Sequence, residues 1–406
     1  MKVVDGAITY PQGFLAAGMH AGLKKEKHDL ALVVSEVMAS AAATYTKNVV
    51  KAAPLHVTKS HLEDGLLRAV IINSGNANAC APEGEKNAEL MCQFTAESLS
   101  IDPKDVAVSS TGVIGVSMSP KMNLVQAGIK YLGKNLGDTP EHALDAAKSI
   151  MTTDLTKKEC IATLTLGGKE VRIGAMAKGS GMIHPNMGTM LGFITTDAAI
   201  SVEMLQKALK DVVNRSFNRI SVDGDSSTND FCLIMANGLA KNPEITSADA
   251  DYEAFLEALL EVSVYLAREI AADGEGATHL ITCRVEHAPD EQMAANLARS
   301  VISSSLVKSA MFGRDANWGR ILCAMGYSGE TFDPEKVSIS FVSTAGEVLV
   351  CQNGRGLSFD EALALKILEP HEIIILIDLA AGEQTATCWG CDLTYEYVKI
   401  NGEYRT

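Results

Sequence analysis

Short apolar runs that end at Gly, Asn or Ser dominate the first half of the chain. Such runs predict buried strands, because strands are commonly about four to eight residues long and are bounded by turn-forming residues. The predicted strands are Leu30–Val34, Leu67–Ile72, Val106–Ser109, Ala162–Leu166 and Val171–Ala175. Two segments, Pro120–Gly133 and Thr139–Ile150, instead carry apolar residues at helical spacing, and the second opens with the helix-start sequence Thr-Pro-Glu.

The clearest amphipathic helix lies at Tyr252–Ala272, farther along the chain. One apolar face recurs at intervals of three or four residues and is formed by Phe255, Leu259, Val262 and Leu266. The Gly at 274 is a typical helix end, because Gly adopts the left-handed conformation that closes many helices. Two further helices are predicted, one from Ser201 to about Arg215 and one at Phe359–Leu368.

The second half also contains buried or alternating segments that predict strands. These are Met190–Ile194, Leu280–Val285, Val337–Phe341, Glu347–Cys351, Glu372–Ile377 and Thr394–Ile400. Strands flanked on both sides by helices indicate an α/β (α+β) protein, a layered sandwich of two sheets face to face with helices outside. The sequence shows no convincing internal repeat and no long low-complexity linker, so it does not mark where one lobe ends and the next begins.

Composition narrows the kind of protein. With 47% hydrophobic and 21% charged residues, the 406-residue chain is long and apolar enough for two or three packed units. A formal net charge of −15 argues against nucleic acid or an anionic membrane as partner, because binding phosphate requires a basic surface. The start of the sequence lacks a signal-peptide core, and the longest apolar run, Ile373–Leu376, is far too short to span a membrane. We therefore expect a cytoplasmic protein.

Two sequence features have a spacing seen in metal or redox sites, but the residues around them argue against such chemistry. The pair Cys388-Trp-Gly-Cys391 has a redox or zinc spacing, but no second Cys or His pair accompanies it and its surroundings favour a strand. Reduced, buried thiols are the preferred interpretation. Asp223, Asp225 and Asp230 lack the Gly and the closing Glu of a calcium loop, so a hydrogen-bonded turn is favoured and no metal cofactor is expected.

The most informative chemistry lies in the Gly-rich segment Lys178–Leu191, where Thr189 follows Gly188. Thr is a weak nucleophile unless a base lies beside it. A cut between Gly188 and Thr189 would supply that base, since a free α-amine has a pKa of about 7.7–8.0. Taken alone, a Gly-Thr pair in such a segment is usually only a turn. A phosphate-binding loop is weaker still, because the sequence lacks the third Gly and the Gly-Lys-Ser/Thr ending.

Several further blocks of the sequence follow, in order, the motifs of one known family. They are Asn73–Ala79, Ser109–Gly115, Thr152–Asp154, Lys178–Leu191, Asp223–Asp230, Gly274–Thr278, Asn317–Arg320, Trp389–Thr394 and Tyr397–Thr406. In these blocks the chain resembles the ArgJ family, the ornithine acetyltransferases (glutamate N-acetyltransferases) of the cyclic arginine pathway. The resemblance implies a helix–sheet–sheet–helix core like that of N-terminal-nucleophile hydrolases, with a C-terminal α/β lobe. It also implies self-cleavage into fragments 1–188 and 189–406, with residues 189–285 completing the core and 286–406 forming the lobe.

The resemblance also assigns roles to particular residues. Thr189 would be the nucleophile and, through its α-amine, the base, while Thr111 and Gly112 would form the oxyanion hole. The residues at the family's substrate-binding positions are Thr152, Lys178, Thr189, Glu275, Asn401 and Thr406. Lys178 could bind a carboxylate and Glu275 an ammonium. From the residues alone, Thr111-Gly112 would be interpreted as an ordinary polar turn. Lys178 and Glu275 would be interpreted as charges exposed to solvent.

The implied reaction moves an acetyl group from N2-acetyl-L-ornithine to L-glutamate by ping-pong exchange through an acetyl-Thr189 intermediate. A bifunctional member would also load Thr189 from acetyl-CoA, although nothing in the sequence identifies a CoA pocket; no other cofactor is expected. The expected assembly is an α2β2 heterotetramer. Most relatives carry Ala where this chain has Gly188, which leaves the rate of cleavage open. The alternatives are an aminopeptidase or amidase, in which water is the acceptor, and an uncleaved metabolite-binding protein.

Overall fold

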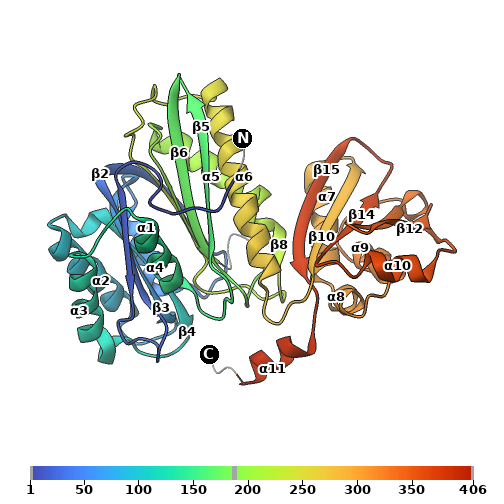
Figure 1. Cartoon of the computed structure of the whole chain (residues 1–406), viewed down its shortest axis with the longest axis horizontal. Helices are drawn as coiled ribbons and strands as arrows, with labels where there is room; N and C mark the ends of the chain where they lie inside the picture. The colour runs from blue at the N-terminus through green and yellow to red at the C-terminus, as the bar shows by residue number, and fades with distance from the viewer. Residues whose placement is uncertain (1–2, 185–189, 404–406) are drawn as a thin grey trace.

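An eight-stranded sheet forms the centre of the N-terminal part of the molecule, and a separate seven-stranded sheet forms the C-terminal lobe (Figure 1). The structure, a computed structural model, describes residues 3–184 and 190–403. The first sheet has the order β4-β3-β2-β9-β7-β6-β5, with β1 also paired to β2. Its strands are β1 (Phe14–Met19), β2 (Leu30–Tyr45), β3 (Leu66–Asn76), β4 (Val106–Val113), β5 (Lys158–Leu166), β6 (Lys169–Lys178), β7 (Leu191–Thr196) and β9 (Phe231–Ala236).

Strand β2 belongs to both halves of this sheet. It is 16 residues long, and its pairing with β3 shifts register between Val34 and Ala39. Its N-terminal part pairs with β3 and its C-terminal part with β9. Val33 of β2 and Leu233 of β9 share one apolar cluster, although they lie on different halves of the sheet. The inner cluster therefore fills the space between two layers that share a strand.

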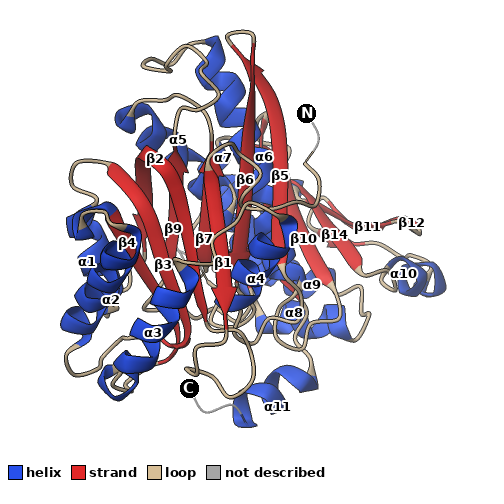
Figure 2. Cartoon of the chain, turned by 60° about the vertical axis from the view of Figure 1, so that its left-hand side comes forward, coloured by secondary structure: helices blue, strands red, loops and turns tan. Residues whose placement is uncertain are grey.

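Two outer apolar clusters cover the opposite faces of the two sheet halves. Leu32, next to Val33 in β2, packs with helices α2 (Gly84–Leu99) and α3 (Met122–Leu132). Ile234, next to Leu233 in β9, packs with α5 (Val202–Arg215) and α6 (Ala250–Ala272). Because neighbouring strand residues face opposite sides, the order from one surface to the other is helix, sheet, sheet, helix. The predicted layered sandwich is confirmed, and its two layers are parts of one hydrogen-bonded sheet (Figure 2).

Two shorter helices complete the N-terminal part. Helix α1 (Ala53–His61) packs on β4 and α2, and α4 (Pro140–Ile150) lies across β1 and β2. Ala143, Ala146, Ala147 and Ile150 of α4 enter the inner apolar cluster. Helix α4 thus covers part of the inner layer, and its C-terminal end leads directly into the segment that begins at Thr152.

The C-terminal lobe is built on a mixed sheet with the order β13-β12-β11-β14-β10-β15-β8. Its strands are β8 (Ile220–Ser221), β10 (Leu280–Ala288), β11 (Ser338–Ser343), β12 (Gly346–Gln352), β13 (Arg355–Gly356), β14 (Glu372–Asp378) and β15 (Gln384–Cys391), and its helices are α7 (Glu291–Ser303), α8 (Ser305–Phe312), α9 (Trp318–Gly326) and α10 (Glu361–Ile367). The expected boundary at 285/286 falls inside β10. All of β10 pairs within this sheet, so the lobe begins before Leu280.

Most predicted elements are present, and one has the wrong type. The segment Thr394–Ile400 was expected to be a strand, but Tyr395–Glu403 forms helix α11. Its alternating apolar residues are not buried in a sheet; Tyr395 and Val398 are 83% and 67% exposed. The Thr394 hydroxyl accepts a hydrogen bond from the Tyr397 amide at 3.4 Å, as a helix cap does. Helices α1, α2, α8 and α9 and strands β1 and β9 were not predicted.

The cysteine pair lies on a strand, as its surroundings predicted. Cys388 and Cys391 are both in β15 and both buried, and all nine cysteines are unpaired thiols. Burial raises the pKa of Cys388 to about 12, so its thiol stays protonated near neutral pH. Within residues 3–184 and 190–403, no helix combines the length and the apolar character that crossing a membrane requires.

Candidate active site

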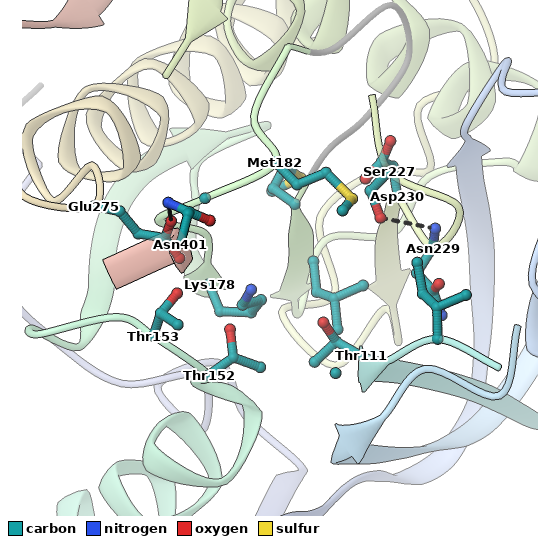
Figure 3. A pocket seen from close by; sticks show the side chains of 15 residues that line it. Thr111, Thr152, Thr153, Lys178, Met182, Ser227, Asn229, Asp230, Glu275 and Asn401 are labelled. Atoms are coloured by element: carbon teal, nitrogen blue, oxygen red, sulfur yellow. Dashed lines mark hydrogen bonds between the residues drawn. The ribbon is translucent and has the colours of Figure 1, made fainter. Parts of the chain in front are cut away.

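A pocket between the sandwich and α11 brings together residues that are far apart in the sequence (Figure 3). Its cavity has a volume of about 140 Å3, which suits a compact substrate. All the predicted site residues that the structure describes line it: Thr111, Gly112, Thr152, Lys178, Glu275 and Asn401. Met190 and Leu191, which come directly after the predicted nucleophile, also line it. Gly188, Thr189 and Thr406 lie outside the described residues.

Thr111 and Gly112 lie in the last part of strand β4, and not in a turn after it. They pair in parallel with Ser74 and Gly75 of β3, and the register becomes irregular at the next residue, Asn76. Gly112 has φ +127°, and a Cβ at this position would lie 2.6 Å from both the Asn76 nitrogen and the Gly75 carbonyl carbon. Only glycine fits this close approach of two strands. The irregularity therefore fixes the main-chain direction next to Thr111.

The Thr111 side chain is available to a ligand. Its hydroxyl makes no hydrogen bond to any part of the chain that the structure describes, and Thr111 lines the pocket. A Thr hydroxyl and a glycine amide on the same short segment can both donate toward an oxygen that becomes negatively charged. This geometry is suited to the predicted oxyanion hole.

Asn229 holds this side of the pocket together, and the sequence reasoning missed it. Its amide nitrogen donates to the Ser110 carbonyl at 2.8 Å and to the Ala77 carbonyl at 2.6 Å, so it joins the ends of β3 and β4. Asn229 is buried and lines the pocket (Figure 3). The available signal was its place in the matching block Asp223–Asp230, which we interpreted only as a turn.

Asp223 makes the local contact that a turn requires, because its carboxylate accepts a hydrogen bond from the Asp225 amide at 3.3 Å, and it also makes contacts far along the chain. Its carboxylate accepts hydrogen bonds from the Met182 amide at 2.6 Å and the Ile183 amide at 2.9 Å. Burial raises the pKa of Asp223 above its usual value, while these two amides lower it. Asp223 therefore holds the segment that leads from β6 toward the predicted cleavage point.

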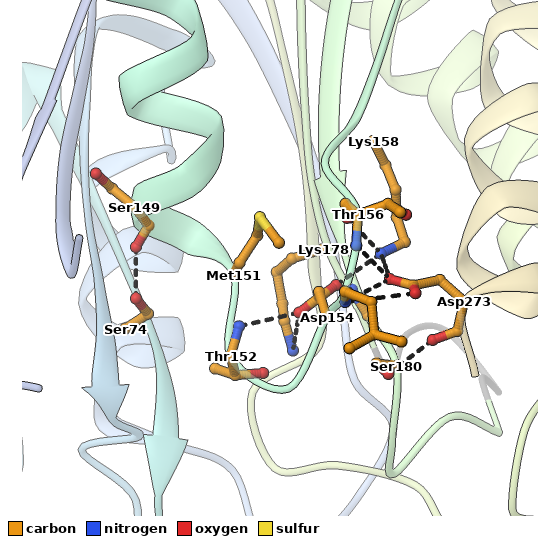
Figure 4. Close-up of polar contacts among 12 residues, drawn as sticks. Ser74, Ser149, Met151, Thr152, Asp154, Thr156, Lys158, Lys178, Ser180 and Asp273 are labelled. Carbon is orange, nitrogen blue, oxygen red and sulfur yellow. Dashed lines mark hydrogen bonds and ion pairs between the residues drawn. The ribbon is translucent and has the colours of Figure 1, made fainter. Parts of the chain in front are cut away.

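Lys178 is the buried cation of the pocket. It is the last residue of β6, and its ammonium lies 3.9 Å from the Asp154 carboxylate. Asp154 is almost completely buried and accepts hydrogen bonds from the Thr152 amide at 2.9 Å and the Gly179 amide at 2.7 Å (Figure 4). Burial alone would raise the pKa of Asp154, but Lys178 and Lys158 hold it well below its ordinary value. Asp154 thus stays ionised and fixes both Thr152 and Lys178.

A second carboxylate extends this buried network to the end of helix α6. The Lys158 ammonium is 2.8 Å from Asp154 and 2.6 Å from Asp273. Asp273 also accepts from the Thr156 amide at 3.2 Å, and its carbonyl accepts from the Ser180 hydroxyl at 2.7 Å. Three segments from distant parts of the chain therefore meet at one group of ions, directly beside Glu275.

Glu275 and Asp230 are two buried carboxylates that line the pocket. The contacts of Glu275 place it at the α11 side. Its amide donates to the Ser180 carbonyl at 2.9 Å, and its carboxylate accepts from the Asn401 side chain of α11 at 2.8 Å. The carboxylate lies so close to Gly181 that a Cβ there would be 2.4 Å from it. Figure 3 shows Glu275 and Asn401 on the opposite side of the pocket from Thr111. The pocket therefore has the cation Lys178, the carboxylates Glu275 and Asp230, and the predicted oxyanion donors around one space.

The fold and the pocket are those of an enzyme that acts on a small molecule. The ArgJ family profile matches residues 15–406, nearly the whole chain. The chain belongs to the ArgJ family.

The chain is similar to curated proteins named arginine biosynthesis bifunctional protein ArgJ. The protein of Symbiobacterium thermophilum is 52% identical over 410 residues, and that of Caldanaerobacter subterraneus is 50% identical over 407 residues; in both cases the match covers 100% of each chain. A crystal structure of arginine biosynthesis bifunctional protein argJ from Bacillus halodurans is 44% identical, with a TM-score of 0.51. The match covers 53% of this chain and 100% of that one.

Proposed function

We propose that this protein is an arginine-biosynthesis acetyltransferase that moves the acetyl group of N2-acetyl-L-ornithine to L-glutamate. The observation that carries the proposal is the pocket itself, in which Thr111-Gly112, Lys178 and Glu275 surround one small cavity. Family membership over residues 15–406 and full-length relatives at about 50% identity support it.

The charges of the pocket match those of the substrate. Lys178 binds the α-carboxylate of acetylornithine, and Glu275 binds its side-chain ammonium, each by a charge-assisted contact. Thr152, beside Lys178, and Asn401, bonded to Glu275, complete the binding surface. The acetyl carbonyl then lies toward Thr111 and Gly112, whose donors stabilise the negative oxygen of the tetrahedral intermediate.

Thr189 carries the acetyl group in this proposal. Its hydroxyl oxygen bonds to the acetyl carbon while its own α-amine takes the hydroxyl proton. The amide C–N bond then breaks, and ornithine leaves with that proton on its amine. The amine of glutamate then attacks the acetyl-Thr189 ester and gives one of its own protons to the α-amine of Thr189. The ester C–O bond breaks, N-acetylglutamate leaves, and the α-amine passes that proton to the threonine oxygen. Thr406, the last residue, is proposed as a further substrate contact.

Such a nucleophile requires cleavage between Gly188 and Thr189. Fragment 189–406 would comprise 218 of the 406 residues, or 54%. The solved Bacillus halodurans chain is covered completely and matches 53% of this chain, which agrees in length with such a fragment. On a denaturing gel we expect two bands, and N-terminal sequencing of the second fragment should read Thr-Met-Leu-Gly. A single full-length band in an active preparation would contradict the proposal.

Acetyl-CoA is proposed as a second acetyl donor, because the relatives are named bifunctional. No other cofactor has a part in the reaction. We further propose an α2β2 heterotetramer of the two fragments, located in the cytoplasm, where the buried free thiols would remain reduced.

Product analysis tests the function directly. Incubation with acetylornithine alone should leave an acetyl group on fragment 189–406, detected by intact mass. Addition of glutamate should remove that group and yield N-acetylglutamate. If free acetate forms at the same rate with and without glutamate, water is the acceptor and the protein is an amidase or aminopeptidase. If the fragment is never acetylated, the covalent mechanism is wrong.

A further inference from the structure

The loop between β1 and β2 is a rigid support at the edge of the pocket. Asp29, completely buried, accepts hydrogen bonds from the amides of Ala21 at 2.6 Å, Gly22 at 3.2 Å and Lys24 at 2.9 Å. A carboxylate that satisfies three amides fixes the main chain of the loop. The direction in which the Lys24 side chain leaves the loop is fixed as a result.

Lys24 uses its whole donor capacity to join three segments. Its ammonium donates to the His28 carbonyl at 3.0 Å, to the Ser74 hydroxyl at 2.6 Å and to the Met151 carbonyl at 2.5 Å. An ammonium has three N–H groups, so none remains for water. The first contact lies within the loop itself, whereas the other two reach β3 and the end of α4.

Both distant contacts of Lys24 adjoin catalytic parts of the pocket. Ser74 is the strand partner of Thr111, and Met151 immediately precedes Thr152. The stem of Lys24 also packs on Gly75, the strand partner of Gly112; a Cβ on Gly75 would lie 2.9 Å from its Cγ. Figure 4 shows Ser74 with Ser149 on one side and Met151, Thr152 and Lys178 on the other. Lys24 bridges these two sides.

We propose that Lys24 is a positioning residue for acyl transfer: its ammonium fixes the oxyanion strand pair relative to the substrate-binding segment that begins at Thr152. This inference rests on the proposed acetyl transfer and deepens it. Lys24 does not line the pocket, so it acts through Thr111, Gly112 and Thr152. Ser74 also donates a hydrogen bond to the Ser149 carbonyl of α4, so Lys24 adds a second tie at this joint. A displacement of about 1 Å between reacting groups can cost on the order of 10²-fold in rate, so loss of the Lys24 tie should have a large effect.

Burial and a neighbouring cation both make the charged form of Lys24 less stable. The pKa of Lys24 is lowered to about 8, chiefly by burial and also by the neighbouring cation Lys178, while Asp29 acts to raise it. At the surface of the protein, neither burial nor a second cation would lower the pKa of a lysine. The Lys24 ammonium instead lies between β3 and the end of α4, where its hydrogen-bond partners offset the cost of burial.

Lys24→Met tests the proposal, because methionine keeps an unbranched stem and removes all three donors. Lys25→Met is the matched control, since Lys25 is the next residue of the same loop and is exposed. Two quantities are compared with the wild type: kcat and KM for transfer per cleaved chain, and the amide hydrogen exchange of peptides that contain Ser74–Gly75 and Met151–Thr152.

The expected result is a fall in kcat of about 10²-fold in Lys24→Met, with KM changed much less. Exchange should become faster in both peptides, and Lys25→Met should match the wild type in every measurement. Counting only cleaved chains separates the effect on transfer from slow maturation. A lower melting temperature with unchanged kcat would overturn the positioning role and leave Lys24 as a stabilising residue. Unchanged exchange in both peptides would equally overturn it.

The same experiment separates the two proposals. A wild-type protein that transfers no acetyl group overturns the proposed function, and with it any role of Lys24 in transfer. The exchange data alone then decide whether Lys24 joins the two segments. If the wild type is active and Lys24→Met keeps its kcat, only the inference about Lys24 falls.

Discussion

The two sides of the pocket are held in place by different kinds of interaction. On one side, Thr111 and Gly112 belong to the paired strands β4 and β3, where main-chain contacts and a glycine with φ +127° fix them. On the other side, Lys178 and Glu275 lie at the ends of β6 and α6, next to the buried ions Asp154, Lys158 and Asp273. Asn401 comes from α11, a helix without a buried residue.

This difference follows from what each side must do. In the proposed mechanism, oxyanion donors act on a charge that forms only in the transition state, so they have to be oriented in advance, and the main-chain pairing of β3 and β4 orients them within the sheet. Recognition of a charged substrate requires ionised groups inside the protein. Such groups are stable only when counter-ions and amides surround them. Substitutions on the first side should therefore change kcat, and those on the second should change stability or KM.

The largest effect is expected from Asp154→Asn on the recognition side. The substitution leaves Lys178 and Lys158 with one carboxylate fewer in a buried site. Breaking a buried ion pair in this way costs about 3–5 kcal/mol of the free energy of unfolding. Denaturant unfolding measures it, with Glu170→Gln as control, because Glu170 forms an exposed pair with Arg172. A loss no larger than in the control would mean that the ions do not hold this side.

The same group makes stability depend on pH. The pKa of Asp154 is lowered in the folded protein, so its contribution is fully present above the unfolded pKa of about 3.9. It is lost as the pH falls through the lower, folded pKa. The difference in unfolding free energy between wild type and Asp154→Asn should therefore be constant near neutral pH and shrink below about pH 4. A difference that does not change down to pH 2 would contradict this assignment.

The oxyanion side should respond in kcat. Thr111→Val keeps the shape and strand preference of the residue but removes its donor, which costs on the order of 10²–10³ in kcat with KM little changed. Steady-state kinetics on cleaved protein measure this. Thr165→Val, an exposed threonine in β5, controls for the substitution itself. A rise in KM with kcat intact would make Thr111 a binding residue.

A smaller effect is expected when the anion is neutralised. In the proposed function Glu275 binds the side-chain ammonium of acetylornithine. Glu275→Gln removes that charge, so KM for this donor should rise about ten- to a hundredfold, equivalent to roughly 1.5–3 kcal/mol. The half-reaction with glutamate should change less, because glutamate has no side-chain ammonium. Glu257→Gln, on the exposed surface of α6, is the control. Equal losses with both substrates would mean that Glu275 only supports the loop.

The smallest effect is expected at the edge of the recognition side. Asn401→Ala removes the hydrogen bond that orients Glu275, worth about 0.5–1.5 kcal/mol, or about two- to tenfold in KM for acetylornithine. Measuring Asn401→Ala and Glu275→Gln singly and together shows whether they act on one contact. Strictly additive effects would contradict the proposed orientation, since residues that share a contact couple.

Patterns along the chain predicted features that depend on neighbouring residues, such as strands and helix starts. Alternating and continuous apolar runs gave the strands, because each buried face requires that period. Ser201 was expected near the cap of α5, and its hydroxyl accepts from the Met204 amide at 3.4 Å. The matching family blocks gave the six described site residues, which the fold brings to one pocket.

Other features could not be predicted, because they depend on partners far away in the sequence. Thr394–Ile400 alternates like a strand, yet no neighbouring strand is available to it, and it forms helix α11. Asn229 and Lys24 resemble any Asn in a turn and any Lys in a loop. Their importance comes from contacts with Ala77 and Met151, more than 100 residues away.

The sequence alone thus determined the strands and helices with clear periodicity, the family and the chemical types around the substrate. The tertiary structure alone decided how the two sides of the pocket are joined. A period of apolar residues is set by burial on a single element, so it can be read along the chain. Lys158 joins Asp154, four positions before it, to Asp273, 115 positions after it. This link exists only after folding has removed water from the three charges.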